Sequence, residues 1–383
     1  MPLAELLDAL DATTPQRVRD QVVVHHPLQP FDIRNVIPGK LVPGVPFTFD
    51  STVLTAARAS SSERSDQPKF ISGPLPAQPH DDVALADLVG FFKDPVKGFF
   101  RALEYTLPWD VDGVSDEISV DIDALEQWAV GDRMLTDMLR GMSPDDARQS
   151  EWRRGTLPPG QLGWRKAGEL REQATVLAST ALAHRTADAE AYDVDVDLGA
   201  GRRLTGTVSP VFHDHLVSVT YSKLDGKHLL ASWIPLLALY AQHPDRDWTA
   251  ICIGRARRSA RPSQRGLGQP RQPAVDLLRD LVAIYDAGRR EPLPLPVKTS
   301  YAWASARLEG GDPEREASFR WKSGMYPAED QDPAQVRAWG ANAWLSVLKQ
   351  DLRPGEEVDG ETHRLGAYSA RLWLPMLRAE VTV

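Results

Sequence analysis

The sequence predicts an α/β fold, in which helices cover a β-sheet. Residues 192–198, 203–208 and 216–221 alternate apolar and polar side chains with a period of two, as strands do. An apolar segment at 228–242 has the length of a helix, and the short apolar run 248–253 is typical of a strand buried on both faces. The order strand–strand–strand–helix–strand, with helices before and after it, indicates an α/β core.

Helices are predicted on both sides of this core. Residues 85–92 are apolar at helical spacing. Asp94-Pro95 then combines an N-cap residue with proline at the first helical position, which predicts a second helix up to Leu103. Pro235 is expected to kink the helix at 228–242. Further helices are predicted at 122–139, 162–185, 275–287 and 333–349.

The first eighty residues differ in composition from the rest. Residues 3–10 predict a short helix with leucines on one face, and 22–49 are rich in Pro, Val and Phe, which predicts short strands and turns. Residues 51–82 are rich in Ser, Pro and Gln, as in a loop or domain boundary. We therefore expect one region at 1–82 and a second at 83–383.

Composition excludes several classes of protein. Of the 383 residues, 42% are hydrophobic and 25% are charged, which excludes global disorder. The net charge of −9 argues against a uniformly basic nucleic-acid coat. The single cysteine, Cys252, excludes internal disulfides, zinc sites with several thiolates and cysteine-held iron–sulfur clusters, and it fits a reducing cytoplasm. The longest apolar stretch, 229–241, is too short to span a membrane.

Three kinds of motif could carry chemistry. Gly39-Lys40 and Gly226-Lys227 lack both the Ser or Thr and the glycine spacing of a phosphate-binding loop, so ATP binding of that type is not expected. The segment His213-Asp214-His215 falls where two strands should turn. It is either a polar hairpin tip or a metal or acid–base site. The acidic run 110–126 fits no calcium loop, and we interpret it as a solvated surface.

A run of arginines is the sharpest electrostatic feature of the sequence. It spans residues 255–271 without any acidic residue, and Gly, Pro, Ser and Gln fill the gaps. The guanidinium group matches phosphate geometry, so we expect a flexible loop that contacts DNA. A solubilising or partner-facing loop is the alternative. The predicted DNA-binding residues are Arg255, Arg257, Arg258, Arg261, Arg265 and Arg271.

Several short stretches, in order, resemble the RecC family, the gamma subunits of the RecBCD helicase–nuclease (exodeoxyribonuclease V). They are HPLQPF (26–31), FTFD (47–50), FFKDPV (91–96), GTLPPG (155–160) and PLPLP (292–296) followed by Ala302-Trp303. Together they cover nearly the whole chain. RecC subunits are far longer, so the resemblance implies the C-terminal third, as a fragment or a split gene product.

The resemblance also implies a fold and the loss of an active site. The expected fold is a degenerate PD-(D/E)XK nuclease-like domain with flanking helices, preceded by the tail of an inactive helicase-like domain. Active members need an Asp on one strand and Asp-x-Lys on the next, which hold magnesium and position water. Here Ser209 takes the first position, Thr220 and Ser222 take the second pair, and Pro159 stands near the place of a further His. Because neutral hydroxyls cannot replace anionic ligands, we expect no catalysis and no metal.

In that family the domain contacts the RecB and RecD subunits, handles double-stranded DNA ends and single strands, and helps to part the duplex during recombinational repair. ATP and Mg²⁺ would be used by the partner subunits, and this chain would hold no cofactor. Trp303, Trp321 and Tyr326 are candidates for base stacking or for subunit contacts. Two alternatives stay open. One is an active nuclease with displaced ligands at 213–215, and the other is an assembly module that binds only proteins.

Overall fold

The computed structural model describes residues 2–63, 70, 71, 73–77, 81–106, 122–257 and 259–383. The chain divides into two compact units, Met1–Pro68 and Lys69–Val383. The predicted division after residue 82 falls inside the second unit, and the assignment of the first part to a helicase-like domain stays a prediction.

The first unit is helical and turn-rich. It contains α1 (Pro2–Thr13), α2 (Arg19–Val22), a 3₁₀ turn at Ile33–Asn35 and α3 (Ser51–Ser61). The predicted helix at 3–10 is confirmed. The strands predicted within 22–49 are wrong, since this segment forms turns and one isolated bridge, Val42 with Val45.

The prediction of a loop from residue 51 is also wrong for its first residues, because Ser51–Ser61 form helix α3. Asp50 caps α3, and its carboxylate accepts hydrogen bonds from the backbone N–H groups of Thr52 and Val53 at 2.7 and 3.3 Å. Such a cap satisfies helix N–H groups that have no partner within the helix. A serine-rich composition concealed this start signal.

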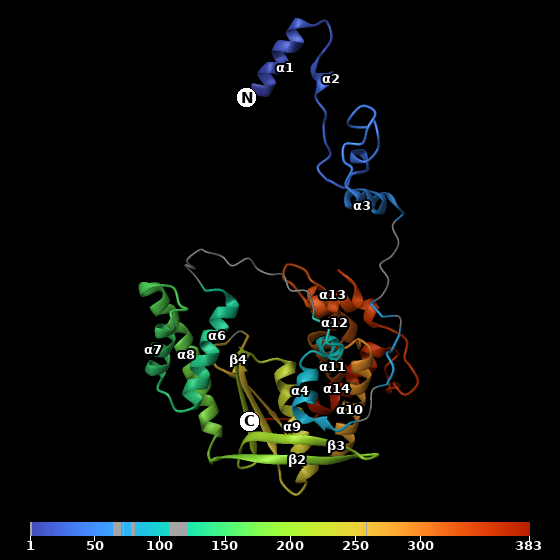
Figure 1. Ribbon diagram of the computed structural model, residues 1–383. Helices are drawn as coiled ribbons and strands as arrows, with labels where there is room; N and C mark the ends of the chain where they lie inside the picture. Colours follow the sequence, from blue (N-terminus) through green and yellow to red (C-terminus); the bar gives the residue numbers. More distant parts are fainter. Residues whose placement is uncertain (1, 64–69, 72, 78–80, 107–121, 258) are drawn as a thin grey trace. The chain divides into compact units, whose positions relative to one another are not determined.

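A seven-stranded mixed sheet forms the centre of the second unit, in the part of the chain described (Figure 1). Strands β2 (Ala189–Gly199), β3 (Arg202–Phe212) and β4 (His215–Lys223) follow each other antiparallel. After α9 (Gly226–Gln242), β5 (Thr249–Arg255) pairs parallel with β4. The predicted strand–strand–strand–helix–strand core is therefore confirmed, and α9 continues through Pro235.

Three further strands complete the sheet. β6 (Ser263–Leu267) pairs antiparallel with β5, and β7 (Glu380–Val381) pairs with β6. β1 (Val83–Ala84) runs parallel to β3 at Leu204 and Thr205. None of the three was predicted, because two residues are too few to show a period and β6 carries no alternation of apolar side chains.

Helices cover both faces of the sheet (Figure 1). One face packs against apolar side chains of α4 (Leu85–Phe92), α9, α10 (Ala274–Arg290) and α14 (Arg364–Leu377). The other face packs against α6 (Ala124–Leu139) and α8 (Gly160–His184), with α7 (Pro144–Arg154) beside them. The strands therefore carry buried side chains on both sides, as a three-layer fold requires.

The remaining helices are α5 (Pro95–Ala102), α11 (Val297–Glu309), α12 (Pro313–Trp321) and α13 (Pro333–Trp339), with 3₁₀ turns at Glu329–Gln331 and Leu345–Leu348. The predicted helix at 333–349 is wrong beyond Trp339. Gly340 adopts a φ of 93°, which ends α13, and the chain resumes only as the short turn at Leu345–Leu348. Sequence patterns also missed α7, α11, α12 and α14.

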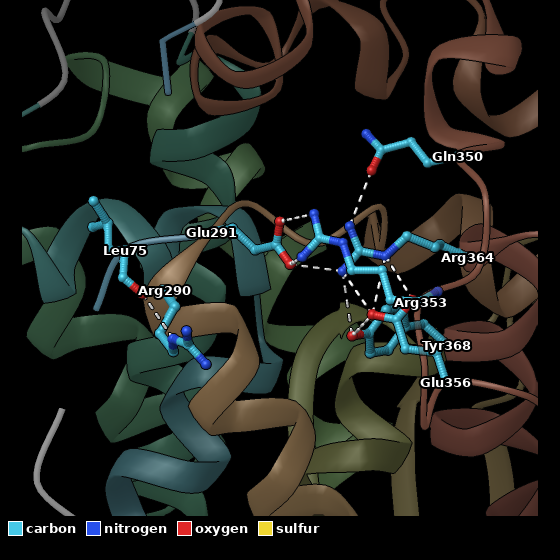
Figure 2. A network of polar contacts seen from close by, with 8 residues as sticks. All are labelled: Leu75, Arg290, Glu291, Gln350, Arg353, Glu356, Arg364 and Tyr368. Carbon is cyan, nitrogen blue, oxygen red and sulfur yellow. Dashed lines mark hydrogen bonds and ion pairs between the residues drawn. The ribbon is translucent and has the colours of Figure 1, made fainter. Parts of the chain in front are cut away.

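A buried ion network joins α10, α14 and the segment between residues 350 and 356 (Figure 2). The Arg364 side chain is 1% exposed, and its guanidinium donates to Glu356 Oε2 at 2.8 Å and to Glu291 Oε1 at 2.7 Å. The Tyr368 hydroxyl donates to Glu356 at 2.7 Å, Arg364 donates to Gln350 at 3.0 Å, and Arg353 forms a second ion pair with Glu291. Burial disfavours the charge, yet the two carboxylates raise the pKa of Arg364 further, so it stays protonated.

We expect Arg364→Met to lower the free energy of unfolding by about 3–5 kcal/mol, because it leaves the buried Glu356 carboxylate without its cation and Glu291 with Arg353 alone. Urea unfolding of the full chain measures this change. The control Arg315→Met removes an exposed pair with Glu316 and should cost at most about 1 kcal/mol. Equal losses in both variants would contradict a central role for the network.

Candidate nucleic-acid interface

The sequence resemblance assigns lost catalytic positions to Ser209 on β3, to Thr220 and Ser222 on β4, and to Pro159 before α8. β3 and β4 pair at Val211↔Leu216 and Phe212↔His215, next to their turn. Ser209 is exposed, and it lies where the pairing of β3 with β2 shifts register. Such a bulge redirects side chains. Pro159 is exposed at the N-cap of α8.

Thr220 and Ser222 are brought together near the end of β4. The backbone N–H of Ser222 donates to Thr220 Oγ1 at 3.1 Å, and Trp128 Nε1 of α6 donates to Ser222 Oγ at 2.9 Å. The Tyr221 ring between them packs on the backbone of Gly131, where an added Cβ would lie 2.1 Å from the ring. α6 therefore closes directly over this stretch of β4.

One carboxylate approaches this stretch from α6. Asp132 accepts a hydrogen bond from the backbone N–H of Tyr221, and burial raises its pKa. On the other side, the Tyr221 hydroxyl donates to Gln173 Oε1 of α8 at 3.0 Å, and the Arg255 guanidinium stacks over the Tyr221 ring at 4.4 Å. Among the residues described, no group of three or more His, Cys, Asp or Glu side chains could hold a metal ion.

The arginine run does not form one flexible loop. β5 and β6 make an antiparallel hairpin, so residues 263–267 are a strand. Arg255 donates to Gln173 at 3.2 Å, and Arg265 is paired with Glu380 of β7. Sequence reasoning missed both partners because they are far away in the chain.

Three members of the run present exposed guanidinium groups. Arg257 and Arg261 lie between β5 and β6, and Arg271 lies between β6 and α10. Arg258 lies outside the described residues. Within the described chain none of these three exposed side chains makes an ion pair, so their charge is available to a ligand.

The segment at 213–215 is a hairpin tip. His213 has a φ of 58°, and the Asp214 carboxylate accepts from Arg246 Nε at 2.8 Å. Arg246 also donates to the Tyr192 hydroxyl at 2.6 Å and stacks over Trp248 at 4.2 Å. The structure thus gives Asp214 an ion-pair partner that sequence reasoning did not identify.

The aromatic candidates divide by exposure. Trp303 and Trp321 are 7% and 1% exposed, so neither ring is free to stack on a base. Tyr326 is 78% exposed. Two further aromatic side chains, Phe319 and Trp344, are exposed to a similar extent, and sequence reasoning missed both. Composition alone cannot separate these two groups, because Trp occurs both in cores and at interfaces.

A basic cavity of about 240 Å³ adjoins the hairpin. It lies between the N-terminal ends of α9 and α11, with α12 also contributing. Its basic side chains are Lys227, Arg257, Arg265, Lys298 and Arg320, and its single acidic side chain is Asp225. Sequence reasoning missed it because only two of the five cations belong to the arginine run.

Comparison with known proteins identifies the family. Residues 80–308 match the family model described as the RecC C-terminal domain. The chain belongs to the RecC family. The resemblance seen in the sequence motifs is therefore confirmed.

Two RecC relatives match along nearly all of the chain. The chain is 71% identical over 380 residues to the RecBCD enzyme subunit RecC of Mycolicibacterium smegmatis, which covers 99% of this chain. It is 59% identical over 384 residues to the subunit of the same name from Mycobacterium tuberculosis, with all of the chain covered. The chain spans 35% of the length of each RecC relative. No helix among the described residues is long and apolar enough to cross a membrane.

We expect Gly131→Ala to destabilise the chain by about 1–3 kcal/mol, because its methyl group would overlap the buried Tyr221 ring. Thermal or urea unfolding measures the change. Gly90→Ala is the matched control, since Gly90 also lies in a helix but an added Cβ meets nothing within 4 Å. The control should be neutral or stabilising by up to about 1 kcal/mol. Stability unchanged by Gly131→Ala would contradict the close packing of α6 on β4.

Proposed function

We propose that this chain is a non-catalytic, DNA-handling and scaffold part of a RecC subunit in a RecBCD (exodeoxyribonuclease V) complex. In this proposal it contacts RecB and RecD and helps to part duplex DNA ends during recombinational repair of double-strand breaks. The family match over residues 80–308 is the observation that carries the proposal.

The topology supports a nuclease-like ancestry. An antiparallel run of three strands is followed by a helix and a parallel strand, which is the arrangement expected from the sequence motifs. The proposed active-site positions carry hydroxyls at Ser209, Thr220 and Ser222 instead of two acids and a lysine. A divalent cation must replace its lost water with charged oxygen ligands, which alcohols do not supply. In this proposal the partner subunits, and not this chain, use ATP and Mg²⁺.

The surface of the first unit supports a scaffold role. Large apolar side chains are exposed along it, including Leu28, which is fully exposed, and Phe49, which is 80% exposed. Apolar surface of this extent is typical of a face that binds another protein. Both residues lie in stretches shared with the RecC family, so we assign this surface to contacts within the complex.

The exposed arginines support the DNA role. Arg257, Arg261 and Arg271 add positive charge in a chain whose net charge is −9. Contacts to phosphate require positive charge within reach rather than a fixed base-reading geometry. Double-stranded ends and single strands are both candidate ligands, because phosphate contacts carry no sequence information.

We expect the tagged chain to retain RecB and RecD on an affinity column in the absence of DNA. The physical reason is the apolar surface of the first unit, which binding would bury. Leu28→Ser with Phe49→Ser should weaken this retention. Wild-type chain that binds neither subunit would contradict the scaffold role.

We expect the purified chain to leave linear DNA intact in the presence of Mg²⁺, because no paired acids stand at the proposed site. Gel electrophoresis of end-labelled DNA measures cleavage. Degradation that disappears in His213→Ala with Asp214→Ala would overturn the proposal and establish a nuclease with displaced ligands.

We expect Arg261→Gln with Arg271→Gln to weaken binding to forked DNA and to reduce the slope of log affinity against log salt by about 2, roughly 1 for each phosphate contact. Fluorescence anisotropy across a salt series measures both quantities. Arg140→Gln with Arg378→Gln changes the same charge at exposed positions elsewhere and should leave the slope unchanged. An unchanged slope in the first variant would favour an assembly module that binds only proteins.

A further inference from the structure

The basic cavity beside the hairpin collects charge from segments that are distant in the chain. Lys227 comes from the first turn of α9, Arg257 from the β5–β6 connection, Lys298 from the first turn of α11 and Arg320 from the end of α12. Four segments that converge on one cavity with the same sign of charge repel each other unless an anion is present.

Two of the three acidic side chains near the cavity, Glu380 and Glu329, already have other partners. Glu380 forms an ion pair with Arg265, so the charge of Arg265 is already neutralised. Asp225 differs, because burial disfavours its charge while His228, Lys227 and Lys298 together lower its pKa, so its charge is shared with two of the cavity lysines. Glu329 accepts hydrogen bonds from the backbone N–H groups of Lys298 and Thr299 at 2.9 and 2.8 Å and from Thr299 Oγ1 at 2.7 Å.

Four cations therefore share a single carboxylate in the cavity lining, that of Asp225. Within the described chain, the side chains of Lys227, Arg257, Lys298 and Arg320 make no ion pair, and all four are exposed. The backbone N–H groups that begin α11 already bind Glu329, so a ligand would be held by side chains rather than by that helix end.

We infer that this cavity is a binding site for one phosphate group, held jointly by Lys227, Arg257, Lys298 and Arg320. The cavity volume of about 240 Å³ is many times the roughly 10–15 Å³ of such space that one water molecule requires, so the cavity has room for a phosphate and part of its hydration shell. Hydroxyl donors are also present, since Ser263 and Tyr301 line the same cavity.

A single-stranded nucleic acid is the ligand that the surroundings favour. Phe319 is 74% exposed, and it is the chain neighbour of Arg320, whose guanidinium lies 5.7 Å from its ring. An exposed aromatic ring next to a phosphate site is the arrangement that holds single strands, because a base can stack while its phosphate is neutralised. The inference rests on the proposed DNA-handling function for this ligand, whereas a free phosphate compound would use the same cations.

The test compares two probes on the full chain, a labelled oligothymidylate strand and inorganic pyrophosphate. Lys227→Gln with Lys298→Gln removes two cavity lysines that are not part of the arginine run. Lys40→Gln with Lys93→Gln is the matched control, since both are exposed lysines that make no ion pair within the described chain. Arg320→Gln, on α12, is an independent cavity variant. Unchanged thermal unfolding shows that each variant is folded.

We expect the cavity double variant to bind the strand about tenfold more weakly, and the salt slope to fall by about 0.7, the value for one phosphate on a single strand. A fall of about 1.4 would mean two separate phosphates and would overturn the shared site. Loss of pyrophosphate binding in the cavity variants, but not in the control, also supports the site. Cavity variants that leave both probes unaffected overturn it.

The two proposals fail in different ways. If Arg261→Gln with Arg271→Gln weakens strand binding while the cavity variants change neither probe, the cavity site is wrong and the DNA-handling function stands. If the cavity variants lose pyrophosphate while no variant affects DNA, the phosphate site stands and the DNA-handling function is wrong.

Discussion

The buried charge of Arg364 is the constraint on which much of the second unit depends. A guanidinium that is almost wholly removed from water must be neutralised, and Glu356 and Glu291 do so from two different segments. Glu291 follows α10 directly, and residues 292–296 lead from it into α11, which carries Lys298. Arg364 begins α14, whose Trp373 donates to Ser300 of α11 at 2.9 Å. The network and this contact together fix the N-terminal end of α11, and hence one wall of the basic cavity.

Two neighbouring regions near the C-terminal ends of β4 and β5 differ in packing and in charge. On one face of the sheet, α6 packs tightly over the end of β4, the stretch that the sequence resemblance assigns to a lost metal site. The tight contact between Gly131 and the Tyr221 ring leaves that stretch occupied by protein atoms. Beyond the C-terminal end of β5, which pairs with the end of β4 at Lys223↔Arg255, the hairpin and the starts of α9 and α11 gather cations instead. The fold thus places a stretch of β4 that α6 covers beside an open basic surface, and the proposed handling of DNA without cleavage uses only the second.

The sequence predicted those elements whose signals are local. The three alternating segments, the apolar helix α9 and the cap at Asp94-Pro95 each contain their own evidence. α14 contains Pro375 and buries polar residues such as Arg364 and Ser369 along with its apolar ones, and the sequence reasoning did not recognise it as a helix. The basic cavity was missed because Lys227, Lys298 and Arg320 are brought together only by tertiary packing. Arg265 was assigned to a loop because its partner Glu380 lies 115 residues away. The motifs identified the family because they are short, specific and in a fixed order.

The most direct test of the account is a high-resolution structure of the assembled complex on forked DNA with Mg²⁺ present. The account predicts strand phosphates against Arg261 and Arg271 and one phosphate among Lys227, Arg257, Lys298 and Arg320. It also predicts protein side chains, and no divalent ion, beside Thr220 and Ser222. A Mg²⁺ ion bound there by carboxylates, with a DNA phosphate in contact with it, would contradict the account.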